Sequence, residues 1–94
     1  MADKNILILL GYDHTNSLEN IINKKNVFCF IYERYKKYIK PENLEKLKDI
    51  MGTSLIISDR VTPTIAQTIA EKNINCLVPL GWRKILDLKD FEGL

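Results

Sequence analysis

Four short apolar runs, rich in branched side chains, recur along the chain and constrain its fold more than any other feature. They are Asn5–Leu10, Val27–Tyr32, Ser54–Ser58 and Asn75–Leu80. Strands that are apolar throughout are buried on both faces, which is typical of parallel sheets covered by helices. Pro79 marks either the end of the last run or an edge position.

Helical patterns fill the intervals between the runs. Helix starts are predicted at Asn16, at Lys40-Pro41 and at Thr62-Pro63, since capping residues and proline favour the first helical turn. Gly52 and Asn73 are the predicted stops of the second and third helices. Beyond them, the spacing of apolar residues up to Phe91 indicates a short final helix or turns.

Strand–helix alternation predicts one domain over residues 1–94, an α/β fold of the doubly wound, Rossmann-like or flavodoxin-like type. We expect a parallel sheet of four strands in the order 2-1-3-4 with helices on both faces. The second and fourth strands would then be the edges. An apolar fourth strand at an edge invites pairing with a second copy, so we expect a homodimer.

Composition and length exclude several classes of protein. Apolar residues make up 46% and charged residues 28% of the 94 residues, which is typical of a globular domain and not of a disordered chain. The longest apolar run, Ile6–Leu10, is far too short to span a membrane, and no signal peptide is recognisable, so we expect a cytoplasmic protein. Cys29, Cys76 and His14 lack the spacing of a metal site or a disulfide framework. We therefore expect no metal and no cofactor.

The predicted ligand site lies beyond the carboxyl ends of the strands, where the strand order reverses. In the order 2-1-3-4 that point falls between the first and third strands. The candidate ligand-binding residues follow the strands in the chain: Gly11, Asp13, His14, Thr15, Asn16, Ser17, Arg34, Asp59, Arg60, Thr62, Trp82 and Arg83.

These residue types suit an anion. The free N–H groups of a helix that begins near Thr15–Ser17 attract phosphate or carboxylate, and Arg60 can bind either through two hydrogen bonds. The same residues also have a purely structural interpretation, because Thr, Asn and Ser are ordinary capping residues and Asp59 can stabilise a helix start. One glycine after the first strand excludes a dinucleotide fingerprint, and the chain has no P-loop.

A basic segment offers a second kind of site. Six cations and one anion lie between Lys24 and Lys40, within a chain of net charge +2. Tyr32, Tyr35 and Tyr38 recur among these cations, a pattern that suits nucleic acid but also ordinary packing against the body of the domain. Lys36, Lys37 and Lys40 are therefore candidates for contact with an acidic protein or a nucleic acid.

The order of motifs resembles a small uncharacterised bacterial Rossmann-like family. Its members have a first strand ending in glycine, a third strand ending in Asp and a last strand reading VPL, as in Ile6–Gly11, Leu55–Asp59 and Val78–Leu80 here. This resemblance implies the fold. Thr62-Pro63 stands where that family commonly has a Ser/Asn-His pair. The chain is more distantly similar to CRISPR-associated Rossmann-fold sensors, which bind a cyclic oligonucleotide across a dimer.

The sequence therefore predicts a binding or regulatory domain for a phosphorylated or nucleotide-like small molecule. The alternative is a small protein-interaction module, of the kind that mobile elements or phages encode, acting through residues 32–40. A weak hydrolase or nuclease assisted by His14 and Asp59 is less favoured, because the sequence contains no identifiable nucleophile–base pair.

Overall fold

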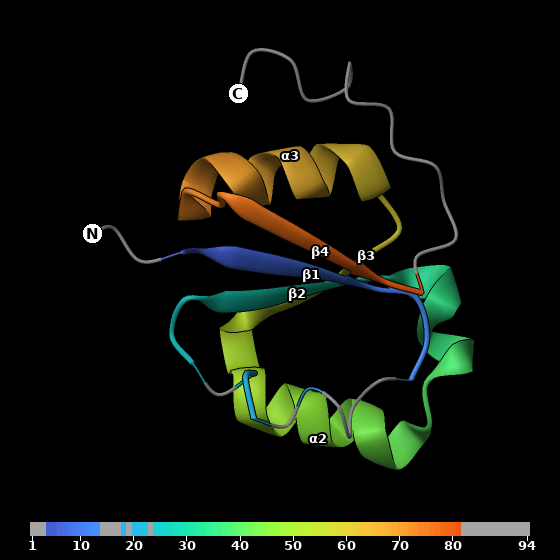
Figure 1. The fold of residues 1–94 in the computed structure, drawn as a ribbon. Helices are drawn as coiled ribbons and strands as arrows, with labels where there is room; N and C mark the ends of the chain where they lie inside the picture. Colours follow the sequence, from blue (N-terminus) through green and yellow to red (C-terminus); the bar gives the residue numbers. More distant parts are fainter. Residues whose placement is uncertain (1–3, 14–17, 19, 23, 82–94) are drawn as a thin grey trace.

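The protein is a four-stranded, all-parallel sheet with helices on both faces, which confirms the predicted fold class (Figure 1). A computed structural model describes residues 4–13, 18, 20–22 and 24–81. The strands are β1 (Ile6–Leu10), β2 (Val27–Tyr32), β3 (Leu55–Ser58) and β4 (Cys76–Leu80). The helices are the 3₁₀ helix η1 (Glu33–Tyr38), α2 (Pro41–Met51), the short 3₁₀ helix η2 (Gly52–Ser54) and α3 (Val61–Lys72).

The order of the strands is 3-2-1-4, so the predicted order 2-1-3-4 is wrong. β1 pairs with β2 and β4, and β3 pairs with β2 alone. The chain steps from β1 to β2 to β3 in one direction, and α3 then carries it back across the sheet to β4. The edges are therefore β3 and β4, and the point of reversal lies between β1 and β4 instead of between β1 and β3.

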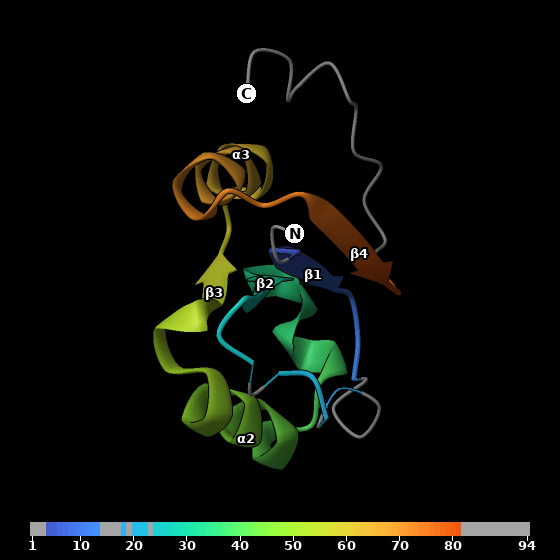
Figure 2. The ribbon, with the colours of Figure 1, turned by 60° about the vertical axis from the view of Figure 1, so that its left-hand side comes forward.

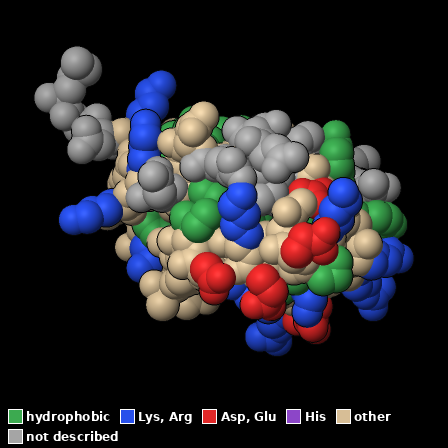
Figure 3. Space-filling view, turned by 90° about the horizontal axis from the view of Figure 1, so that it is seen from below, with side chains coloured by type: hydrophobic (Ala, Val, Ile, Leu, Met, Phe, Trp, Pro, Cys, Tyr) green, Lys and Arg blue, Asp and Glu red, His purple; other side chains and the backbone are tan. Residues whose placement is uncertain are grey.

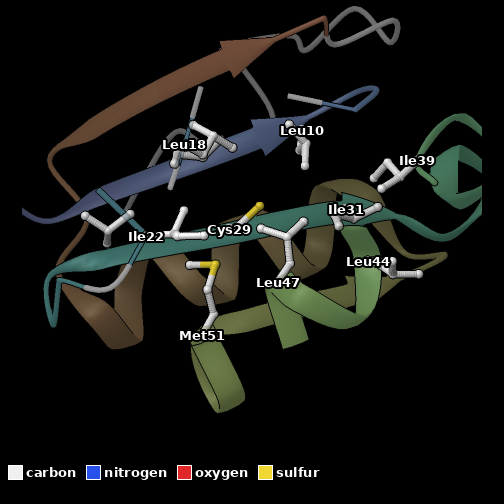
Figure 4. Packing of buried hydrophobic residues seen from close by; sticks show 11 residues of the cluster. Leu10, Leu18, Ile22, Cys29, Ile31, Ile39, Leu44, Leu47 and Met51 are labelled. Atoms are coloured by element: carbon white, nitrogen blue, oxygen red, sulfur yellow. The ribbon is translucent and has the colours of Figure 1, made fainter. Parts of the chain in front are cut away.

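Two hydrophobic clusters hold the layers together. The larger one lies between the sheet and α2 and includes Ile8, Cys29 and Leu47 (Figure 4). The smaller one, with Leu7, Phe30 and Ile65, lies on the face covered by α3. Figure 2 shows α2 and α3 on opposite sides of the sheet. Among residues inside the four predicted strands, Ile8 is fully buried, whereas Phe28, Ile56 and Val78 are partly buried.

Most predicted helix ends are confirmed. Pro41 is in the first turn of α2, Gly52 caps its carboxyl end with φ of 55°, and Asn73 ends α3 in the left-handed conformation. Thr62 is not the cap of α3, because Arg60 has extended backbone angles and the helix already begins at Val61. Of the predicted helix from Asn16, Leu18 and Ile22 are buried in the larger cluster, and Asn16 lies outside the described residues.

β4 is an edge strand, as expected, and its unpaired side is closed to a further strand at one position. Cys76 N–H donates to Asn5, and the Leu80 carbonyl accepts from Gly11, so these alternate residues face β1. Leu77 and Pro79 consequently face outward, and proline has no N–H to donate. This placement protects an exposed edge against strand addition. No helix in the described part of the chain is long and apolar enough to cross a membrane.

Candidate functional site

The strand order reverses between the carboxyl ends of β1 and β4. We call this position the crevice, after the place where open α/β sheets bind their ligands. Ligands of open α/β sheets bind at such points because the connections diverge there to opposite faces. Leu10 pairs with Leu80, and Gly11 N–H donates to the Leu80 carbonyl at 2.8 Å, so the two strands stay joined up to this edge. The next residues in register are Gly11 and Gly81. Two glycines thus leave the backbone at the crevice without side chains.

Tyr12 and Gly81 are in direct contact at this crevice. Gly81 has φ of 66°, and a Cβ built on it would lie 2.0 Å from Cε1 of Tyr12. The Tyr12 ring therefore occupies the space that a side chain at position 81 would need. Tyr12 is 41% exposed, so the contact presents aromatic surface beside the reversal point. The predicted site set omitted both residues, because their proximity depends on the pairing of β1 with β4.

Asp13 anchors the segment after β1 to the start of α2. Its Oδ2 accepts a hydrogen bond from the Lys40 backbone N–H at 3.2 Å and from Asn43 Nδ2 at 2.7 Å. Lys40 is the N-cap residue of α2 and makes no side-chain cap hydrogen bond of its own. A carboxylate at a helix start is favourable for the helix dipole. Asp13 thereby fixes Tyr12 and Gly11 relative to the domain body.

The remaining described candidates lie after β2 and β3, on the other half of the sheet. Because Tyr32 pairs with Ser58, Arg34 and Arg60 each follow the end of one of two adjacent strands. Ser58 Oγ accepts from Arg60 N–H at 3.0 Å and from Thr64 Oγ1 at 3.2 Å, which fixes the turn into α3. Asp59 and Arg60 are exposed, and Thr62 is half-buried in the first turn of α3. Arg34 follows β2, the direct neighbour of β1, whereas Asp59, Arg60 and Thr62 follow β3, two strand spacings or about 10 Å from β1.

The basic segment does not form one surface. Lys24 and Lys25 precede β2, whereas Arg34, Lys36, Lys37 and Lys40 follow it, so the length of the strand lies between the two groups. Residues three apart eclipse in a 3₁₀ helix, and the tyrosines accordingly form a row through η1. Tyr35 is buried and contacts Tyr32 edge-on at 5.0 Å, and Lys37 Nζ lies 5.2 Å from the centroid of the exposed Tyr38 ring.

Neither cysteine belongs to the crevice. Cys29 lies in the middle of β2, and burial raises the pKa of its thiol to about 12, so it stays protonated at neutral pH. Cys76 is the first residue of β4, so it lies at the amino end of that strand, away from the crevice. The described residues contain no group of three or more His, Cys, Asp or Glu that could hold a metal ion.

Of the predicted contacts, Gly11 and Asp13 lie at the β1 side of the crevice, and Arg34, Asp59, Arg60 and Thr62 lie at the ends of β2 and β3. His14, Thr15, Asn16, Ser17, Trp82 and Arg83 lie outside the described residues. No family model, curated protein or solved structure matches this chain. The resemblances drawn from its short motifs therefore stay predictions.

Proposed function

We propose that this domain binds an anionic, phosphorylated or nucleotide-like small molecule in the crevice between the carboxyl ends of β1 and β4. The observation that carries the proposal is the reversal of strand order at two glycines that are level in register, Gly11 and Gly81. Open α/β sheets bind ligands at such a reversal point, and the exposed Tyr12 ring, which packs over Gly81, borders it. A binding role, and not catalysis, remains our expectation, as does a cytoplasmic location.

The exposed Tyr12 ring supports a ligand with an aromatic base. Stacking of a base on an aromatic side chain contributes about 1–3 kcal/mol by alanine substitution. Gly81 and the anchored Asp13 restrict where the ring can lie, which reduces the ordering cost on binding. Arg60 follows β3, two strands from β1 and three from β4, so we no longer assign it a contact with a small ligand held at β1 and β4. Arg34 follows β2, directly beside β1, and stays a candidate contact.

We expect a nucleotide to raise the melting temperature of the wild-type domain, and Tyr12→Ala to remove that rise. A ligand at a hundred times its Kd stabilises a protein by about 2.7 kcal/mol through mass action. The measurement is a thermal-shift panel of orthophosphate, sugar phosphates, mononucleotides and cyclic nucleotides, on protein shown by native mass spectrometry to carry no copurified ligand.

Tyr38→Ala is the matched control, since Tyr38 is 40% exposed and Tyr12 41%, but Tyr38 follows β2. Tyr38→Ala and Arg60→Ala should both retain the shift. Loss of the shift with Arg60→Ala, together with its retention in Tyr12→Ala, would place the ligand at β2 and β3 instead. No shift with any anion would favour the protein-interaction module built on residues 32–40.

Two copies are proposed to associate through the side chains of β4. Leu77 is 39% exposed and Pro79 is exposed beside it on an edge strand. Because Pro79 offers no N–H to a neighbouring strand, we expect apolar packing between copies and not a continuous sheet.

Sedimentation should show a dimer at micromolar concentration, and Leu77→Lys should shift it to the monomer. Ile50→Lys is the matched control, because Ile50 is 38% exposed on α2. A strictly monomeric wild type at about 100 µM, equivalent to binding weaker than roughly −5 kcal/mol, would contradict the dimer.

A further inference from the structure

The dipeptide Lys-Asn occurs just before three of the four strands. Lys4-Asn5 precedes β1, Lys25-Asn26 precedes β2, and Lys72-Asn73 ends α3 shortly before β4. Parallel strands all begin on the same side of a sheet, so these three segments lie together at the amino ends of the strands, opposite the ligand crevice. We call this region the amino edge.

The asparagines join the three segments. Asn5 Nδ2 donates to the Asn73 carbonyl at 3.1 Å, and Asn5 N–H donates to Asn75 Oδ1 at 3.0 Å. Asn26 Nδ2 donates to the Lys4 carbonyl, and Ile6 N–H donates to the Asn26 carbonyl at 2.9 Å. This network fixes the backbone of the neighbouring lysines relative to one another.

The lysines of this edge form a group of like charges. Lys4 lies two residues before β1, Lys24 and Lys25 lie in the turn before β2, and Lys72 is the last residue of α3. All four are exposed, and Lys72 Nζ also lies 5.8 Å from the centroid of the Phe28 ring. Within the part of the chain that the structure describes, none of them forms an ion pair, and the nearby Glu71 accepts a hydrogen bond from Gln67. Like charges gathered at one end of a sheet repel one another, and a bound polyanion relieves that repulsion.

We propose that Lys4, Lys24, Lys25 and Lys72 form a surface that binds the phosphate backbone of a nucleic acid. Of the described residues, the exposed aromatic ones, Tyr12 and Tyr38, both lie beyond the carboxyl ends of the strands, whereas four exposed cations lie at the amino edge, a charge pattern complementary to a phosphate backbone. The asparagine amides are occupied by the network and do not read bases. Binding is therefore independent of sequence and driven by release of counterions.

The neighbouring faces do not share this charge. Figure 3 shows the face of α2, where acidic and basic side chains are interspersed, and Lys and Arg side chains project both at its left margin, the side on which the strands begin, and at its right margin. On α2 itself, Lys48 pairs with Glu45 at 3.5 Å.

The test is fluorescence anisotropy with a short labelled DNA duplex of arbitrary sequence over a series of salt concentrations. The affinity of the full chain should fall with salt with a slope of about −0.9 for each phosphate contact in a plot of log K against log salt. Lys24→Ala/Lys25→Ala should weaken binding at low salt by at least about tenfold and reduce the magnitude of the slope by about two.

The matched control is Lys37→Ala/Lys40→Ala, which removes the same charge at the opposite edge of the sheet. It should leave the slope unchanged. Equal losses in both double variants would overturn the proposal, because general attraction to a basic protein would then explain them. Polyglutamate that binds as tightly as DNA, with the same dependence on Lys24 and Lys25, would overturn it in favour of an acidic polypeptide, and absence of DNA binding at low salt would overturn it outright.

Discussion

Gly81→Ala should destabilise the domain, chiefly through its backbone. A residue with a side chain costs roughly 1–2 kcal/mol in the left-handed region, and φ at Gly81 is 66°. The added Cβ also meets the Tyr12 ring, which must move aside; because this ring is the end of a side chain that is 41% exposed, its displacement adds a smaller cost. Urea unfolding of Gly81→Ala, with and without Tyr12→Ala, separates the two contributions.

In the Tyr12→Ala background, we expect the cost of Gly81→Ala to fall to the backbone contribution alone. Gly52→Ala is the control, since Gly52 has φ of 55° but nothing within 4 Å of the added Cβ. Gly52 directly precedes the edge strand β3, far from Tyr12, so the stability lost on Gly52→Ala should be the same in both backgrounds. An equal cost of Gly81→Ala in both backgrounds would show that the Tyr12 ring does not occupy that space.

The features predicted correctly from the sequence are those that depend on nearby residues. Pro41, Gly52 and Asn73 mark helix boundaries through their own backbone preferences, which any fold containing these helices must satisfy. The four strands were likewise recognisable, because each is a continuous apolar run. Thr62 was predicted to cap α3 because its residue type suits a cap, but the turn that leads into α3 is fixed by Ser58 Oγ instead.

The strand order could not be derived in the same way. Right-handed crossovers permit both 2-1-3-4 and 3-2-1-4, so connectivity alone does not choose between them. One signal was present and unused. The third apolar run has only three apolar residues, Leu55–Ile57, whereas Val27–Tyr32 is apolar over six, as expected for an edge strand and an inner strand respectively.

The error in strand order carried over to the candidate site. Arg60 was grouped with the end of the first strand because β3 was expected beside β1. Tyr12 was left out because β4, which carries Gly81 to the Tyr12 ring, was not expected beside β1. The group of lysines was invisible for the same reason, since Lys4 and Lys72 come together only through the pairing of β1 with β4. The spacing of three between Tyr32, Tyr35 and Tyr38 fits the 3₁₀ helix η1, in which residues three apart eclipse.

Ile8→Ala should cost more stability than the same substitution at Ile56, and both should cost enough to measure. Large-to-small changes of this type cost about 2–5 kcal/mol, and the cost rises with the cavity that remains. Ile8 is 0% exposed in β1, flanked by β2 and β4, so its surroundings cannot collapse into the space. Ile56 is partly buried in the edge strand β3, where neighbours and water can fill part of the gap. We therefore expect values near the upper end for Ile8 and near the lower end for Ile56, as shifts of the urea midpoint at constant m-value. An unchanged midpoint for Ile56→Ala would contradict the placement of β3 in the sheet, and equal losses at both positions would contradict its place at the edge.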